Sequence, residues 1–173
     1  MNKLPTVLAL SAVTLVIAGC GGSSKTSSTS TPAGVPSTPS TATSTPATGG
    51  VKIASSTVAG LGPVLVNAQG HTLYTFAPDK DKKVTCVSAC AAIWPPAALP
   101  SGQKPIAAGP VKQSLLGSDP NPSGGQVITY AGWPLYTYVA DTGPGQHAGQ
   151  ALNLNGGLWY VISPAGKVIT QKP

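Results

Sequence analysis

Two cysteines four residues apart, Cys86 and Cys90, are the side chains of this sequence best placed to react with one another. Residues four apart on a helical turn have Cα atoms about 6 Å apart, a distance that a disulfide can bridge. An oxidising compartment would favour that bond, so we expect one short helical turn over residues 86–93 with a local structural disulfide. The alternative is a redox dithiol, or a metal site that recruits His71 or His147, although the spacing is not the Cys-x-x-Cys of thioredoxin-like sites.

Carboxylates that could serve an enzyme are scarce, because the sequence has four Asp and no Glu. Two of them, Asp79 and Asp141, follow apolar runs and are expected to accept hydrogen bonds from backbone amides in the next turn. A metal or catalytic site that brings both together is the alternative. The sequence contains neither Gly-x-Ser-x-Gly nor His-Glu-x-x-His. We therefore expect a protein that is not an enzyme and has no cofactor, and we leave metal binding open.

The N-terminal region predicts export. Lys3 precedes an apolar stretch of about fifteen residues, shorter than the roughly twenty that cross a bilayer, and small residues precede Cys20. This layout predicts a signal peptide over residues 1–19. The ending Ile-Ala-Gly-Cys resembles the lipobox of bacterial lipoproteins, which implies that Cys20 carries diacylglycerol and fatty acyl chains such as palmitate. Residues 20–50 are almost entirely Gly, Ser, Thr, Pro and Ala, a composition that predicts a disordered tether.

The charged residues of the sequence indicate which partners the protein is expected to bind. The net charge is +6 and the isoelectric point is about 9.4, yet the sequence has no Arg, whose guanidinium group leads in recognising bases and phosphates. The lysines of residues 80–83 are interleaved with aspartates, a pattern that predicts a solvated loop. We therefore expect no nucleic-acid partner. The expected partners are the membrane, through the lipid anchor, and a cell-wall polymer or envelope protein, with the protein extracytoplasmic on the cell membrane or outer membrane.

Residues 51–173 form one predicted domain that contains an internal repeat, with cores over 64–79 and 127–141. Residues 70–79 match residues 132–141 at their Gly, Leu, Tyr, Thr and Asp positions, and each copy is followed further on by a Trp. Within each copy, alternate residues point to opposite faces of a strand, and both faces look covered. One face carries Leu73, Thr75, Ala77, Leu135, Thr137 and Val139, and the other carries Tyr74, Phe76, Tyr136 and Tyr138.

Turn and proline signals complete the fold prediction. Residues 67–70 and 163–166 each end in Gly and have type I turn signatures, so each would join two short strands. Residues 95–122 are too rich in proline to supply many central strands. We expect an all-β domain of two related repeats of short antiparallel strands, with long ordered loops. Trp94 is expected to be buried and Trp133 to be the most exposed tryptophan.

The repeat resembles a known family, the bacterial secreted-repeat lipoproteins with a Tyr-x-(Phe/Trp/Tyr)-x-x-Asp motif. The matching residues are Tyr74, Phe76 and Asp79 in the first copy and Tyr136, Tyr138 and Asp141 in the second, and segments 85–96 and 156–164 also fit. In place of the Asn-Gly turn common there, this chain has Ala131-Gly132. The resemblance implies a surface or periplasmic domain without an agreed biochemical role. From the sequence as a whole we expect a membrane-anchored, non-catalytic binding or structural module of the cell envelope with an unknown ligand. The alternative is a redox or metal-handling protein that uses Cys86, Cys90 and a His.

Overall fold

A computed structural model describes residues 49–81 and 83–172 of the chain. The predicted signal peptide, the lipid site at Cys20 and nearly all of the predicted tether lie outside these residues. No helix in the described part is long and apolar enough to cross a bilayer.

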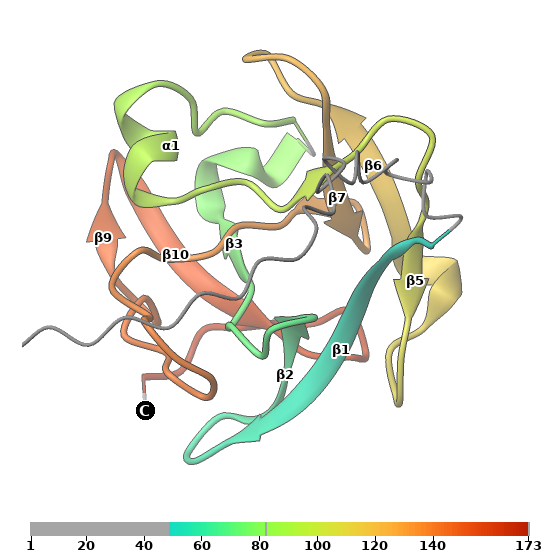
Figure 1. Ribbon diagram of the computed structural model, residues 1–173. Helices are drawn as coiled ribbons and strands as arrows, with labels where there is room; N and C mark the ends of the chain where they lie inside the picture. Colours follow the sequence, from blue (N-terminus) through green and yellow to red (C-terminus); the bar gives the residue numbers. More distant parts are fainter. Residues whose placement is uncertain (1–48, 82, 173) are drawn as a thin grey trace, which may run out of the picture. The chain divides into compact units, whose positions relative to one another are not determined.

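The described chain is all-β, as predicted, and consists of three small sheets (Figure 1). In the first sheet, β1 (Val51–Val58) lies between β2 (Gly62–Asn67) and β5 (Pro105–Ala107). In the second, β10 (Gly157–Ile162) lies between β3 (Tyr74–Phe76) and β11 (Val168–Ile169), and β9 (Asn153–Leu154) also pairs with β10. In the third, β7 (Gln126–Tyr130) pairs with β4 (Ala98–Leu99), β6 (Leu116–Pro120) and β8 (Trp133–Pro134).

Most of the pairing is antiparallel, but β1 and β5 pair in parallel, which the sequence did not predict. The proline-rich region supplies β4, β5 and β6, all at sheet edges, where a missing amide removes no ladder bond. The predicted helical turn is present as α1 (Ala89–Ile93), three residues shorter at its start than expected. Two 3₁₀ turns, η1 (Ala77–Asp81) and η2 (Gln113–Leu115), were not predicted.

The two repeats are built into each other. β10, which contains Trp159, pairs with β3 of the first repeat, with Val161 opposite Tyr74. The segment after Trp94 meets the second repeat through a single bridge, Pro96 opposite Tyr136, and then forms β4 beside β7. Each repeat therefore contributes its last strand to a sheet that also contains a strand of the other repeat.

The predicted division of each repeat strand between two faces is confirmed at its centre. Leu73 and Leu135 lie in one buried cluster, and Tyr74 and Tyr136 lie in the other. The prediction is wrong at the end of the second copy, where Val139 is 53% exposed. Its amide donates to the carbonyl of Ile93 at 3.1 Å, because the chain has left the sheet to follow α1. The first copy also ends early, since Ala77 begins η1.

The two predicted type I turns are confirmed by amide-to-carbonyl hydrogen bonds, from Gly70 to Asn67 at 3.0 Å and from Gly166 to Ser163 at 2.9 Å. A tight two-residue turn also joins Tyr130 to its ladder partner Trp133. In it, Ala131 has φ 51°, a left-handed conformation that glycine or asparagine adopts more readily than alanine.

Candidate functional site

The tyrosines and aspartates of the repeated motif form two crossed pairs. Tyr74 Oη donates to Asp141 Oδ2 at 2.5 Å, and Tyr136 Oη donates to Asp79 Oδ2 at 2.6 Å. The two tyrosines are also joined through their backbones, since each amide donates to the carbonyl of the other at 2.8 and 3.0 Å. Each tyrosine thus bonds the aspartate of the other repeat, so the motif works between repeats and not within one.

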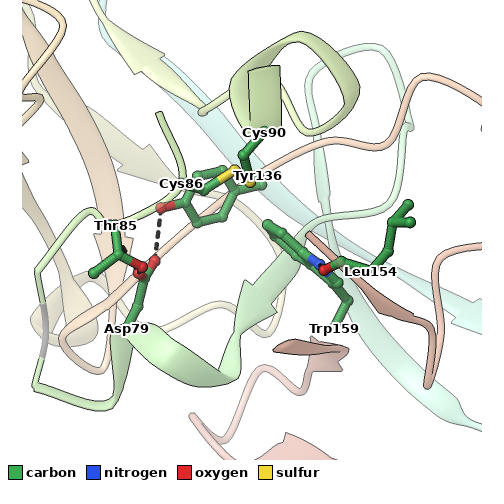
Figure 2. Close-up of a disulfide and its surroundings, with 7 residues drawn as sticks. All are labelled: Asp79, Thr85, Cys86, Cys90, Tyr136, Leu154 and Trp159. Atoms are coloured by element: carbon green, nitrogen blue, oxygen red, sulfur yellow. Dashed lines mark hydrogen bonds between the residues drawn. A yellow bond between two sulfur atoms is a disulfide. The ribbon is translucent and has the colours of Figure 1, made fainter. Parts of the chain in front are cut away.

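The second oxygen of each carboxylate is bonded close by in sequence. Asp79 Oδ1 accepts hydrogen bonds from the amide of Thr85 at 2.9 Å and from its hydroxyl, as Figure 2 shows. Asp141 Oδ1 accepts from the amide of Ala148 at 2.9 Å. These are amide contacts of the kind expected from the sequence. Both aspartate side chains are buried and fully engaged, and they bond separate sets of partners.

Burial sets the protonation of this network. Desolvation raises the pKa of Asp79, and the hydrogen bonds from Thr85 and Tyr136 oppose this by stabilising the carboxylate. Desolvation also raises the pKa of Tyr74 and of Tyr136, and the aspartate that each contacts raises it further. Both phenols therefore remain protonated donors across the ordinary pH range. Neither is available as a phenolate nucleophile or base.

A stack of four aromatic rings runs through the same region. Its order is Phe76, Trp159, Trp94 and Tyr138, with ring centroids 4.1, 3.8 and 4.2 Å apart. The order alternates between repeats, because each motif aromatic stacks on the tryptophan of the other repeat and the two tryptophans stack at the centre. Tyr74 meets Trp94 edge-on, and Tyr136 meets Trp159 edge-on. Each such pair adds about 0.5–1.5 kcal/mol beyond its buried area, so the stack is a major contact between the repeats.

The predicted disulfide joins Cys86 and Cys90, whose Cα atoms lie 5.2 Å apart. Figure 2 shows it beside Tyr136. Cys86 directly follows Thr85, whose amide donates to Asp79, as Gly149 directly follows Ala148, whose amide donates to Asp141. In the other half, the amide of Gly149 donates to the hydroxyl of Tyr74 at 3.3 Å. Cys86 and Gly149 therefore hold equivalent places in the two halves, and only the first half is cross-linked.

The two histidines lie near backbone carbonyls. His71 Nδ1 is 3.0 Å from the carbonyl oxygen of Asp141, and His147 Nδ1 is 3.1 Å from that of Gly145. Among the residues that the structure describes, no group of three or more His, Cys, Asp or Glu is arranged to hold a metal ion. In the oxidised form the two sulfurs bond each other and offer no thiolate to a metal.

Two tryptophans were assigned opposite environments from the sequence. Trp94 is fully buried, as expected, and its amide donates to the carbonyl of Cys90 at 2.8 Å at the end of α1. Trp133 is the most exposed of the three tryptophans, as expected, although it is half-buried because it pairs with Tyr130 and packs against the second buried cluster.

The crossed pairing was missed from the sequence. A signal for it was present, because a Tyr and an Asp at fixed spacing recur in both repeats and follow strands with two covered faces. Buried polar groups need partners. With no Arg in the sequence to neutralise a carboxylate, the twin copy of the motif was the natural source of a donor.

A family model described as a secreted repeat of unknown function matches the chain twice, over residues 55–98 and 120–163. Each match contains one complete tyrosine-to-aspartate motif and one tryptophan of the central stack. No curated protein and no solved structure matches the chain.

Proposed function

Because the chain belongs to the secreted-repeat family of unknown function, we propose that it is a non-catalytic binding or structural module of the bacterial cell envelope, held at the membrane by a lipid on Cys20. The chain is secreted in this reading, and its folded domain works outside the cytoplasm.

The observation that carries the proposal is that the tyrosines and aspartates of the family motif are buried and bond each other. The carboxylates of Asp79 and Asp141 are buried, and each accepts a tyrosine hydroxyl and a backbone amide. Carboxylates bonded in this way join two repeats, and their burial keeps a substrate from reaching them. The motif therefore stabilises a scaffold, and any ligand must meet other surfaces.

Export is supported by the cysteines. A disulfide between Cys86 and Cys90 persists in oxidising compartments and is rare in the cytoplasm. The lipid anchor is supported by the sequence before Cys20, whose thiol is then the attachment point. No observation in the described residues favours the redox or metal-handling alternative.

The anchor is tested by expressing the chain in a bacterium fed an alkyne fatty acid. The protein is expected to take up the label and to partition into the membrane fraction, whereas Cys20→Ala loses both properties. Cys86→Ala is the matched control, because it removes a thiol from the folded domain and should keep the label. An intact mass without lipid on Cys20 in membrane-extracted wild type would refute this part of the proposal.

A further inference from the structure

An open cleft of about 440 Å³ lies in the first half of the domain, beside β4. Its walls come from the start of β1, the turn at residues 67–69, and the segment Pro96–Ala98. Val51, Pro96 and Ala98 supply exposed apolar surface, and the buried side chains of Ile53 and Leu73 lie beneath. The crossed tyrosine and aspartate side chains do not line it, so it is separate from the site described above.

The equivalent place in the second half is filled by the chain itself. Pro96 lies opposite Tyr136 as Val161 lies opposite Tyr74. On its other edge, Val161 pairs with Ile169 of β11. In the described chain, β4 pairs with β7 alone and has no counterpart of β11, because after Leu99 the chain turns away to form β5 beside β1.

The side walls of the cleft support this equivalence. In the second half, Tyr130 Oη donates to the carbonyl of Pro164, and a Cβ on Gly166 would lie 3.1 Å from Ala131 Cβ. The equivalent bonds from the amide of Leu73 to the carbonyl of Leu65 and from the amide of Leu135 to the carbonyl of Ile128 place Asn67, which also lines the cleft, where Tyr130 stands.

Ala68 and Gln69 both line the cleft. The open space thus corresponds to the hairpin of residues 163–169, which the first half lacks.

Some backbone groups along the exposed edge of β4 point away from the sheet. The amide of Ala97 donates to Leu135 and its carbonyl accepts from Ile128, both at 2.8 Å, so these groups point into the sheet. Backbone groups of successive strand residues point to opposite sides. The amide and carbonyl of Ala98 therefore point away from β7, as does the carbonyl of Pro96, and both residues line the cleft. An extended peptide satisfies such an edge by adding to it as a strand.

We propose that this cleft binds an extended peptide segment of another envelope protein, which adds as a strand to the outer edge of β4. This inference rests on the proposed function as a binding module and names its site and partner. The filled equivalent, β11, has Val168 and Ile169, so the segment carries adjacent β-branched apolar residues. Lys52 is the charged residue of the cleft wall, so the segment has no positive charge and is neutral or acidic.

The test uses the detergent-solubilised mature protein and the peptide fluoresceinyl-Thr-Val-Ile-Thr-Glu-amide, labelled at its N-terminus, with anisotropy as the readout. Saturable binding is expected. A peptide with proline in place of isoleucine should bind at least about tenfold more weakly, since it disrupts strand pairing. No saturation up to about 1 mM, or equal binding of the proline peptide, would overturn the proposal.

Two variants locate the site. Ala68→Tyr places a ring on the turn that forms a wall of the cleft and should weaken binding by about tenfold or more. Ala98→Pro removes the amide that points away from β7 and should do the same. Ala165→Tyr, in the hairpin of the other half, is the control and should bind as wild type does.

Full-strength binding by both cleft variants, with folding confirmed by circular dichroism, would place the peptide elsewhere and end the proposal. The lipid-labelling experiment does not depend on this cleft, so the two failures are distinguishable.

Discussion

The crossed arrangement of the motif predicts which residues are energetically coupled. A double-mutant cycle combines Tyr136→Phe, which removes one hydroxyl, with Asp79→Asn, which removes one charge at nearly constant shape. Hydrogen bonds to charged groups contribute about 1.5–3 kcal/mol, and the buried Tyr136–Asp79 bond at 2.6 Å belongs to this class. The coupling free energy of this pair should therefore be about 1.5–3 kcal/mol. The equivalent pair, Tyr74 and Asp141, should show coupling of similar size.

The control cycle uses the same Tyr136→Phe with Asp141→Asn, the aspartate of its own repeat. Asp141 bonds Tyr74 and not Tyr136, so this coupling should be below about 0.5 kcal/mol. Urea unfolding at pH 7, followed by tryptophan fluorescence with the disulfide intact, gives all the free energies. Equal coupling in the crossed and the same-repeat cycles would refute the assignment of the motif to contacts between repeats.

Three further changes have defined outcomes. Ala131→Asn should raise stability by about 0.5–1 kcal/mol, measured as a higher melting temperature, because asparagine tolerates the φ of 51° better than alanine. Gly149→Ala should cost about 1–3 kcal/mol in urea unfolding, since its Cβ would lie 2.8 Å from rings of the aromatic core, whereas Gly143→Ala meets nothing within 4 Å and should change stability by less than about 0.5 kcal/mol. Because burial raises the pKa of Asp79 in the folded state, the native protein takes up this proton more readily than the unfolded chain. Wild type should therefore gain stability relative to Asp79→Asn as pH falls from above the raised pKa towards 3.8, and urea midpoints across that window would contradict this if the difference stayed constant or reversed.

The parts of the fold that were predictable from the sequence are those set by local chemistry. Alternation of side chains identified the two-faced strand at Leu73 and Tyr74, and glycine at the last turn position identified residues 67–70 and 163–166. The spacing of Cys86 and Cys90 predicted the disulfide, although Cys86 lies before α1, because residues so near in sequence meet through a local turn of the chain. In each case the determining contacts lie within a few residues of each other.

The parts that were not predictable depend on contacts between distant segments. Val139 follows the alternation of its strand in sequence, yet the chain bends towards Ile93 there, a contact that no local pattern encodes. The crossing of the tyrosine pairs required knowledge that β10 pairs with β3. In the sequence of one repeat, the tyrosine and the aspartate look like partners of each other. Only the exchange of strands shows that each aspartate bonds the tyrosine of the other repeat.

The exchange of strands also explains where the two halves are free to differ. The central stack and the crossed pairs need an equivalent residue from each repeat, so a change in one repeat breaks a contact made by the other. Outside these contacts the halves diverge: the first has the disulfide between Cys86 and Cys90, with Cys86 buried in the core, and the second has β11 at a sheet edge. The open cleft beside β4 lies where the first half lacks a counterpart of β11. The peptide-binding proposal assigns a function to this second difference, because an unpaired strand edge can accept a further strand.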